Sequence, residues 1–145
     1  MNRNQKILVQ SSKEKTLDSL NLLKASLTSI SPFDPSRKYT PKEREPFDAL
    51  SDRFIRSVEI SIKFFRSYEL LLEGTNSETL RDLLNKMEKL KLISQTEMWI
   101  QMRDIRNRIV HDYASESIQE IYKLIMGQFG KELLNLKTKL ETIEI

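Results

Sequence analysis

The chain has 145 residues, enough for one domain with a buried core, and a formal net charge of +3. It contains no cysteine and one histidine, which excludes a disulfide framework and argues against a zinc site held by one chain. Only 3 glycines and 4 prolines provide turn signals, so the composition favours helices over an all-β fold.

The amino-terminal residues are polar, and no apolar segment approaches the roughly 20 residues that cross a bilayer. We expect a soluble, cytoplasmic protein that forms one helical domain over residues 1–145, with residues 1–11 flexible. We expect neither a metal nor another cofactor. The small positive charge permits contact with nucleic acid without requiring it.

The first helix is predicted by an amphipathic pattern that begins near Ser12 and repeats at three and four residues up to Ile30. Prolines in residues 31–35 end it, because proline cannot continue a helix. All 4 prolines lie in the segment that reaches Pro46, together with several basic residues. We interpret this segment as a basic loop between helices.

A second helix is predicted from Phe47 to Gly74, and its aromatic-rich stripe indicates a core face rather than a cofactor box. Three later places match a capping box, in which a serine or threonine is followed three positions on by glutamate. Each match predicts the start of a further helix. The three pairs are Thr75 with Glu78, Ser94 with Glu97, and Ser117 with Glu120.

The last helix contains Gly127 and Gly130, which weaken a helix locally and predict a bend or a close helix contact. With this helix the chain has five amphipathic segments joined by short loops. The sequence therefore predicts an all-α, up-and-down bundle of about five helices.

The helix predicted from Ser94 carries the residues best suited to chemistry, between positions 103 and 113. They include His111, the only histidine, and three arginines within six residues. Histidine is the side chain whose ordinary pKa lies nearest neutrality. If the protein is an enzyme, His111 is the first candidate for a catalytic residue.

The faces of this helix follow from a rotation of about 100° per residue. The stripe expected to face the core consists of Met98, Met102, Ile105 and Ile109. Arg103, Asn107 and His111 fall on the opposite side, with Ile100 and Val110 beside them. Mixed polar and apolar residues on an outward face favour a contact with a partner subunit.

Arg106 lies on the flank between these faces, about 140° around an ideal helix from His111. The two side chains therefore do not meet easily within one straight helix. Either the helix ends or kinks near His111, or the functional pair forms across a dimer.

Simpler interpretations of the same residues exist. Asp104 and Arg108 are spaced for a surface ion pair along a helix, and Asp112 could extend it. A single histidine on a helix is more often structural than catalytic. An arginine cluster is usually a solvated or ion-paired face.

Arg106 and Asn107, followed by His111 and then Tyr113, resemble the R-x4-6-H motif of HEPN domains. The form Arg-Asn, then His-x-Tyr, is similar to HepT-type proteins, which pair with MNT-type minimal nucleotidyltransferases in prokaryotic toxin–antitoxin operons. The short helix predicted ahead of Trp99 is an arrangement similar to that of a related branch of the family, the nucleotidyltransferase substrate-binding subunits. The similarity covers roughly residues 47–140, and the first 46 residues are not matched.

The resemblance implies a bundle that dimerises through the motif helix. Arg106 and His111 of both chains would form a composite cleft that cleaves RNA without a metal ion, with His111 as acid or base and Arg106 stabilising the phosphorane. Arg103 would add positive field, and Asn107 would orient the helix or His111. Tyr113 would accept AMP from the nucleotidyltransferase antitoxin, although a core tyrosine at a helix end is equally ordinary.

Two main functions remain open at this point. One is a homodimeric ribonuclease toxin neutralised by a nucleotidyltransferase. The other is a non-catalytic subunit whose same face binds a nucleotide or docks the transferase; a plain helical interaction module is a third. The complete Arg106 and His111 pair favours the first, because a binding module needs no base. Aromatic residues that could approach the cleft are Phe33, Tyr39, Phe47 and Phe54.

Overall fold

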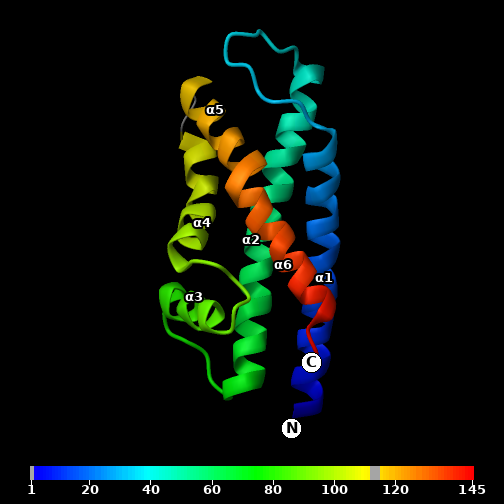
Figure 1. Ribbon diagram of the computed structural model, residues 1–145, viewed down its shortest axis with the longest axis vertical. Helices are drawn as coiled ribbons and strands as arrows, with labels where there is room; N and C mark the ends of the chain where they lie inside the picture. The colour runs from blue at the N-terminus through cyan, green and yellow to red at the C-terminus, as the bar shows by residue number, and fades with distance from the viewer. Residues whose placement is uncertain (1, 112–114) are drawn as a thin grey trace.

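A computed structural model of the protein describes residues 2–111 and 115–145, and these residues form helices and loops with no strand among them. The order is α1 (Asn2–Ser29), α2 (Pro41–Glu73), α3 (Leu80–Lys89), α4 (Thr96–His111), α5 (Ser115–Leu124), η1 (Ile125–Phe129) and α6 (Gly130–Thr142). The π-helical segment η1 joins α5 and α6 into one rod (Figure 1). The described residues thus form five helical rods, which confirms the predicted all-α bundle.

The two long helices α1 and α2 lie side by side along the length of the molecule (Figure 1). On one side of this pair, α4 packs along α2, and α6 crosses over α1 and α2. The short helix α3 lies near the end of α2 and the beginning of α4. No described helix combines the length and the apolar character that a bilayer span requires.

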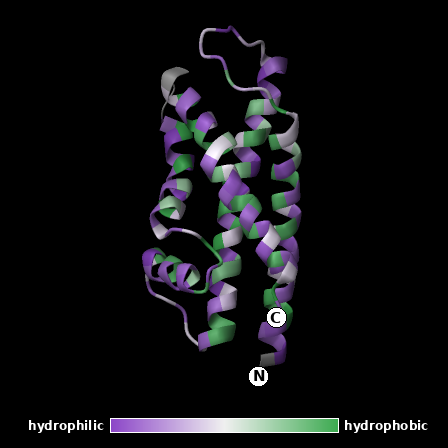
Figure 2. Ribbon diagram, in the orientation of Figure 1, coloured by the Kyte–Doolittle hydropathy of each residue, from purple (hydrophilic) through white to green (hydrophobic). Residues whose placement is uncertain are grey.

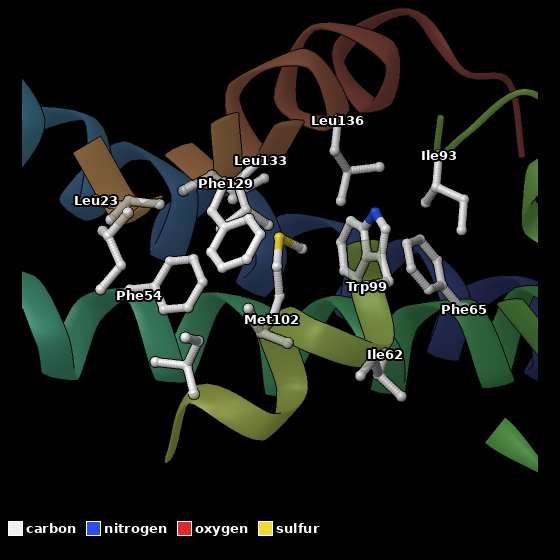
Figure 3. Close-up of a cluster of buried hydrophobic side chains, with 14 of the residues drawn as sticks. Leu23, Phe54, Ile62, Phe65, Ile93, Trp99, Met102, Phe129, Leu133 and Leu136 are labelled. Atoms are coloured by element: carbon white, nitrogen blue, oxygen red, sulfur yellow. The ribbon is translucent and has the colours of Figure 1, made fainter. Parts of the chain in front are cut away.

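The apolar stripes of the helices meet in one core (Figures 2 and 3). Trp99 of α4 is 0% exposed, and its ring packs against that of Phe65 of α2 at 5.1 Å between centroids. Phe54 stacks on Phe129 of η1 at 5.9 Å. The aromatic stripe of α2 therefore belongs to the core, as predicted. Burying each side chain of this size contributes about 2 to 3 kcal/mol to stability.

The buried stripe of α4 differs slightly from the prediction. Met102 and Ile105 are buried as expected, but Met98 and Ile109 are only half-buried, and Trp99 takes the central place. Thr96 is the fourth buried residue of the stripe. The large indole needs the most space between α2 and α6, and it therefore decides how α4 is rotated.

Helix α1 begins at Asn2, whereas the sequence pattern predicted a start near Ser12. The polar amino-terminal residues hide this start, because α1 there presents only a narrow apolar face. Val9, which is 1% exposed, is its buried residue in this region. The prediction that the helix begins at Ser12 is therefore wrong.

Helix α2 also begins earlier than predicted, at Pro41 rather than Phe47. Thr40 accepts a hydrogen bond from the Glu43 backbone N–H at 3.2 Å, and the Glu43 carboxylate accepts one from the Thr40 backbone N–H at 3.0 Å. This is a true capping box with proline at the first helical position, which suits proline. Pro46 lies inside the helix, so the predicted loop ends at Thr40.

The three predicted capping boxes are wrong. Helix α3 is capped by Thr79, whose hydroxyl accepts from the Asp82 N–H at 3.1 Å, and not by Thr75. Ser117 lies inside α5. Ser94 lies before α4, which begins at Thr96, and it is bound instead by a glutamate of α6.

The two glycines of the last rod behave as predicted. Gly127 has φ −100° and ψ −115°, which interrupts the regular helix within η1. At Gly130 a Cβ atom would lie 2.4 Å from the Ile125 carbonyl oxygen and 3.0 Å from Cδ1 of Leu27. Gly127 therefore marks the distortion, and Gly130 marks the close approach of the rod to α1.

Candidate functional site

The candidate site lies on α4, and a buried carboxylate fixes where α4 begins. Glu132 of α6 is 6% exposed. It accepts hydrogen bonds from the Ser94 backbone N–H at 2.9 Å, the Ser94 hydroxyl at 2.7 Å and the Trp99 indole N–H at 2.8 Å. Hydrogen bonds to a charged acceptor are stronger than neutral ones, so Glu132 ties α4 firmly to α6.

A second glutamate holds the first residue of α4 to α3. The Glu88 carboxylate accepts from the Thr96 backbone N–H at 2.8 Å and from its hydroxyl at 3.1 Å. A carboxylate at this position satisfies an amide that the helix leaves unpaired and complements the positive end of its dipole. Glu88 therefore acts as the cap that the sequence pattern assigned to Ser94.

The carboxyl-terminal half of α4 is open to solvent on the face that the periodicity predicted. Arg103, Asn107 and His111 are all exposed, and Val110 beside them is 52% exposed. Ile100 is half-buried against the core. An exposed valine among polar groups keeps this face suited to a partner subunit.

Three of the predicted residues come together with residues of α2 around one depression. We name it the α2–α4 hollow; its volume is about 520 Å³, and it is lined by Glu59, Ile62, Arg66, Arg103, Arg106 and Asn107. Its lining therefore contains three guanidinium groups and one carboxylate. Such a lining attracts anions, and guanidinium groups match the oxygens of a phosphate.

Arg106 is the residue that links the two helices across this hollow. Its Nη1 donates to Oε1 of Glu59 at 2.9 Å, and the two side chains are 64% and 51% exposed. Exposed ion pairs of this kind contribute little to stability, because solvent screens them. Breaking this pair therefore costs little stability.

His111 is not among the residues that line the α2–α4 hollow. Helix α4 is continuous from Arg106 through His111, so the displacement of about 140° between them applies. Within one chain the structure does not bring these two side chains together. Tyr113, the predicted AMP acceptor, lies outside the described residues.

The predicted ion pair between Asp104 and Arg108 does not form. Asp104 instead accepts a hydrogen bond from Asn107 at 3.3 Å, and Arg108 lies 3.9 Å from Glu120 of α5. The neighbouring helix offers Arg108 a carboxylate that the sequence spacing could not reveal. Asp112, the possible extension of that pair, lies outside the described residues.

None of the aromatic residues considered for base stacking lines the hollow. Phe33, Tyr39 and Phe47 pack together, and Phe33 and Phe47 also pack against Tyr122 of α5, with ring centroids 5.1 to 5.3 Å apart. Phe54 is completely buried. These rings stabilise the junction of the loop, α2 and α5 and offer no stacking platform at the site.

Sequence reasoning missed the contribution of α2 to the site. Glu59, Ile62 and Arg66 follow one another at three and four residues, so they share a face of α2. The charged residues of that face were visible as positions off the apolar stripe. Only the packing of α4 shows which of them meet Arg103 and Arg106.

The chain belongs to the family described as nucleotidyltransferase substrate binding protein like, a HEPN-type family, whose model matches residues 15–142. This confirms the resemblance stated from the motif. The match also includes most of α1 and the loop after it, which the motif comparison left unmatched. No curated protein matches the chain significantly.

Proposed function

We propose that this protein is a ribonuclease toxin that acts as a homodimer and that a nucleotidyltransferase antitoxin neutralises. The observation that supports this proposal best is the α2–α4 hollow, where Arg106 and Asn107 of the R-x4-H motif lie together with Arg103 in a basic depression. His111 is exposed on the same helix, available to a substrate held between two copies. RNA and the transferase would both be met in the cytoplasm.

The chemistry is an attack of a ribose 2′-oxygen on the adjacent phosphorus. One His111 takes the proton of the 2′-hydroxyl, the P–O5′ bond breaks, and the leaving 5′-oxygen receives a proton from a second histidine. The products are a 2′,3′-cyclic phosphate and a 5′-hydroxyl. Arg106 stabilises the extra negative charge of the phosphorane, and this route requires no metal ion.

The dimer follows from the histidine count. Each chain has one histidine, and the reaction uses one base and one acid, so His111 of the partner subunit completes the pair. The exposed face of α4 around Val110 is the surface through which we pair the two copies. Arg103 adds positive field, and Asn107 positions the end of the helix.

The family description supports the partner, because it names a nucleotidyltransferase. By resemblance to HepT-type proteins, the transferase attaches AMP to Tyr113 and silences the toxin. Intact-mass measurement after co-expression with the cognate transferase should show the added AMP in the wild type and not in Tyr113→Phe. A mass increase that survives this substitution would assign the acceptor elsewhere.

The alternative is a non-catalytic subunit that binds a nucleotide or substrate for the transferase. Two observations favour it: the family description itself, and the ion pair in which Glu59 occupies Arg106. In this case the hollow binds phosphate, but His111 has no chemical task. The two functions therefore differ in what His111→Ala does.

The deciding experiment is inducible expression of the wild type and His111→Ala, each without the transferase, with growth and total RNA integrity followed together. Gln101→Ala is the matched control, an exposed residue of α4 that does not line the hollow. The proposal expects growth arrest with RNA cleavage in the wild type and control and none in His111→Ala. Equal behaviour of all three, with each shown to be folded, contradicts the ribonuclease proposal.

A further inference from the structure

Arg66 of α2 faces the same hollow as the motif residues of α4, although it lies far from the motif in sequence. It is half-buried, whereas Arg103 and Arg106 are exposed. Its own backbone carbonyl accepts a hydrogen bond from Asn76 at 2.8 Å, which holds this turn of α2 to the following loop. Arg66 is therefore the least exposed arginine of the three.

The charges around Arg66 leave it available to an anion. Among the residues whose side chains the structure describes, 3–111 and 117–145, neither Arg66 nor Arg103 has a carboxylate within ion-pair distance, whereas Arg106 has Glu59. A guanidinium group that is partly withdrawn from water binds an anion more strongly than an exposed one, because solvent screening is weaker. Three guanidinium groups facing one carboxylate leave the hollow positive overall.

The direction of the helices spreads these charges along the hollow. Trp99 contacts Phe65 and Arg106 contacts Glu59, so α4 runs antiparallel to α2. Arg66 lies seven residues from Glu59, which is about 10 Å along α2. Arg66 therefore lies at the end of the hollow away from the Glu59–Arg106 pair, on the side of Arg103.

We propose that Arg66 is a phosphate-binding residue that holds the phosphate next to the one bound at Arg106. The ligand of the hollow is then a stretch of single-stranded RNA with at least two phosphates, rather than a mononucleotide. This inference rests on the proposed function, because it takes RNA as the ligand. It adds a residue of α2 to a site otherwise built from the motif helix.

The test is binding of a fluorescent single-stranded oligonucleotide whose 2′-oxygens are methylated, so that it cannot be cleaved. Affinity is measured by anisotropy between about 50 and 200 mM salt, because each phosphate contact contributes about 0.7 to the slope of log affinity against log salt for single strands. Arg66→Ala should weaken binding and lower this slope by about 0.7. Arg66→Lys should retain the slope.

The matched control is Arg56→Ala. Arg56 also lies on α2 and is exposed, but it pairs with Asp52 at 2.8 Å and lines a different depression, beside α1. The control should bind as the wild type does. Arg66→Gln keeps most of the side-chain length but removes the charge. It should lower the salt slope by the same amount as Arg66→Ala, and so it separates the effect of lost charge from any loss of folding.

Three results would overturn the inference. If Arg103→Ala weakens binding while Arg66→Ala and Arg66→Gln bind as the wild type does, Arg66 is not a phosphate ligand, and the proposed function stands. If Arg66→Ala weakens the binding of AMP as much as the binding of the oligonucleotide, Arg66 and Arg106 hold the same phosphate. If the wild type shows no salt-dependent binding, the RNA ligand of the proposed function is wrong, and Arg66 has no phosphate to hold.

Discussion

The two halves of α4 are held in opposite ways. The beginning of the helix is fixed by Glu88 and Glu132, and its Trp99 is completely buried. The second half presents Arg103, Arg106 and His111 to solvent, and its one ion pair to α2 is exposed. The first half stabilises the fold, whereas the second half leaves its charged groups exposed to solvent.

This difference separates stability from function along one helix. Substitutions in the first half should lower the free energy of unfolding, and substitutions in the second half should leave it unchanged while they change ligand binding or cleavage.

The largest effect is expected at Glu132. Glu132→Ala leaves the Trp99 indole N–H and the Ser94 backbone N–H without their acceptor, and the free energy of unfolding should fall by about 3 kcal/mol. Urea unfolding of the wild type and the variant measures this fall in the free energy of unfolding. Glu132→Gln keeps one accepting oxygen and should lose less. Wild-type stability in Glu132→Ala would show that the first half of α4 is not held by this carboxylate.

A comparable effect should appear with pH at Glu69, where α2 meets the loop before α3. Burial raises the pKa of Glu69, but hydrogen bonds from the Ser77 hydroxyl and N–H, together with Lys86 at 3.0 Å, outweigh it and lower the pKa from 4.5 to about 2. Because the folded pKa lies below the unfolded one, the stabilisation is complete above about pH 4.5 and is lost as pH falls towards 2. The loss amounts to about 3 kcal/mol.

Urea unfolding across this acid range, compared between the wild type and Glu69→Gln, measures the contribution of Glu69. The difference between the two proteins should be largest near pH 5 and shrink towards pH 2. A difference that does not change with pH would contradict the role of this carboxylate.

A smaller loss is expected at Gly130. A Cβ atom there meets the backbone carbonyl of Ile125 and the Leu27 side chain, so Gly130→Ala should destabilise the protein by about 1 to 3 kcal/mol. Gly127→Ala is the control, because a Cβ atom at Gly127 has no heavy atom within 4 Å. Thermal unfolding that ranks the control below Gly130→Ala would contradict the close contact between the last rod and α1.

The smallest effects on stability are expected in the exposed half of α4. Arg106→Ala and Arg108→Ala should each change the free energy of unfolding by no more than about 0.5 kcal/mol. Their effects on RNA cleavage should differ, because Arg106 lines the hollow and Arg108 does not. Cleavage assays should show loss in Arg106→Ala and near-normal rates in Arg108→Ala. Equal loss in both would contradict the assignment of the two residues to different faces.

The sequence predicts the rods well, because the apolar residues repeat at helical spacing and the last rod carries its glycines at the distortion and the close contact. It predicts the helix starts poorly. Three serine or threonine residues match a capping box without forming one, while the true box of Thr40 and Glu43 is concealed among prolines. The cap of α4 comes from Glu88 on another helix, which no local pattern could reveal.

The candidate site was predictable to the extent that it lies on one helix. Arg103, Arg106 and Asn107 line the same hollow, although the helical periodicity placed Arg106 on the flank beside the face of the other two. Glu59 and Arg66 join them only because α2 packs antiparallel to α4, and this depends on contacts far apart in the sequence. The predicted pair of Arg108 with Asp104 failed for the same reason, because a contact far apart in the sequence brings Arg108 to Glu120 on another helix.

The most direct test measures stability and RNA cleavage on the same purified protein, as wild type and as His111→Ala. Because His111 is exposed at the end of α4, the substitution should leave the free energy of unfolding unchanged. Cleavage of a labelled single-stranded RNA should be lost. Cleavage at the wild-type rate by a folded His111→Ala protein would contradict the assignment of chemistry to the exposed half of α4.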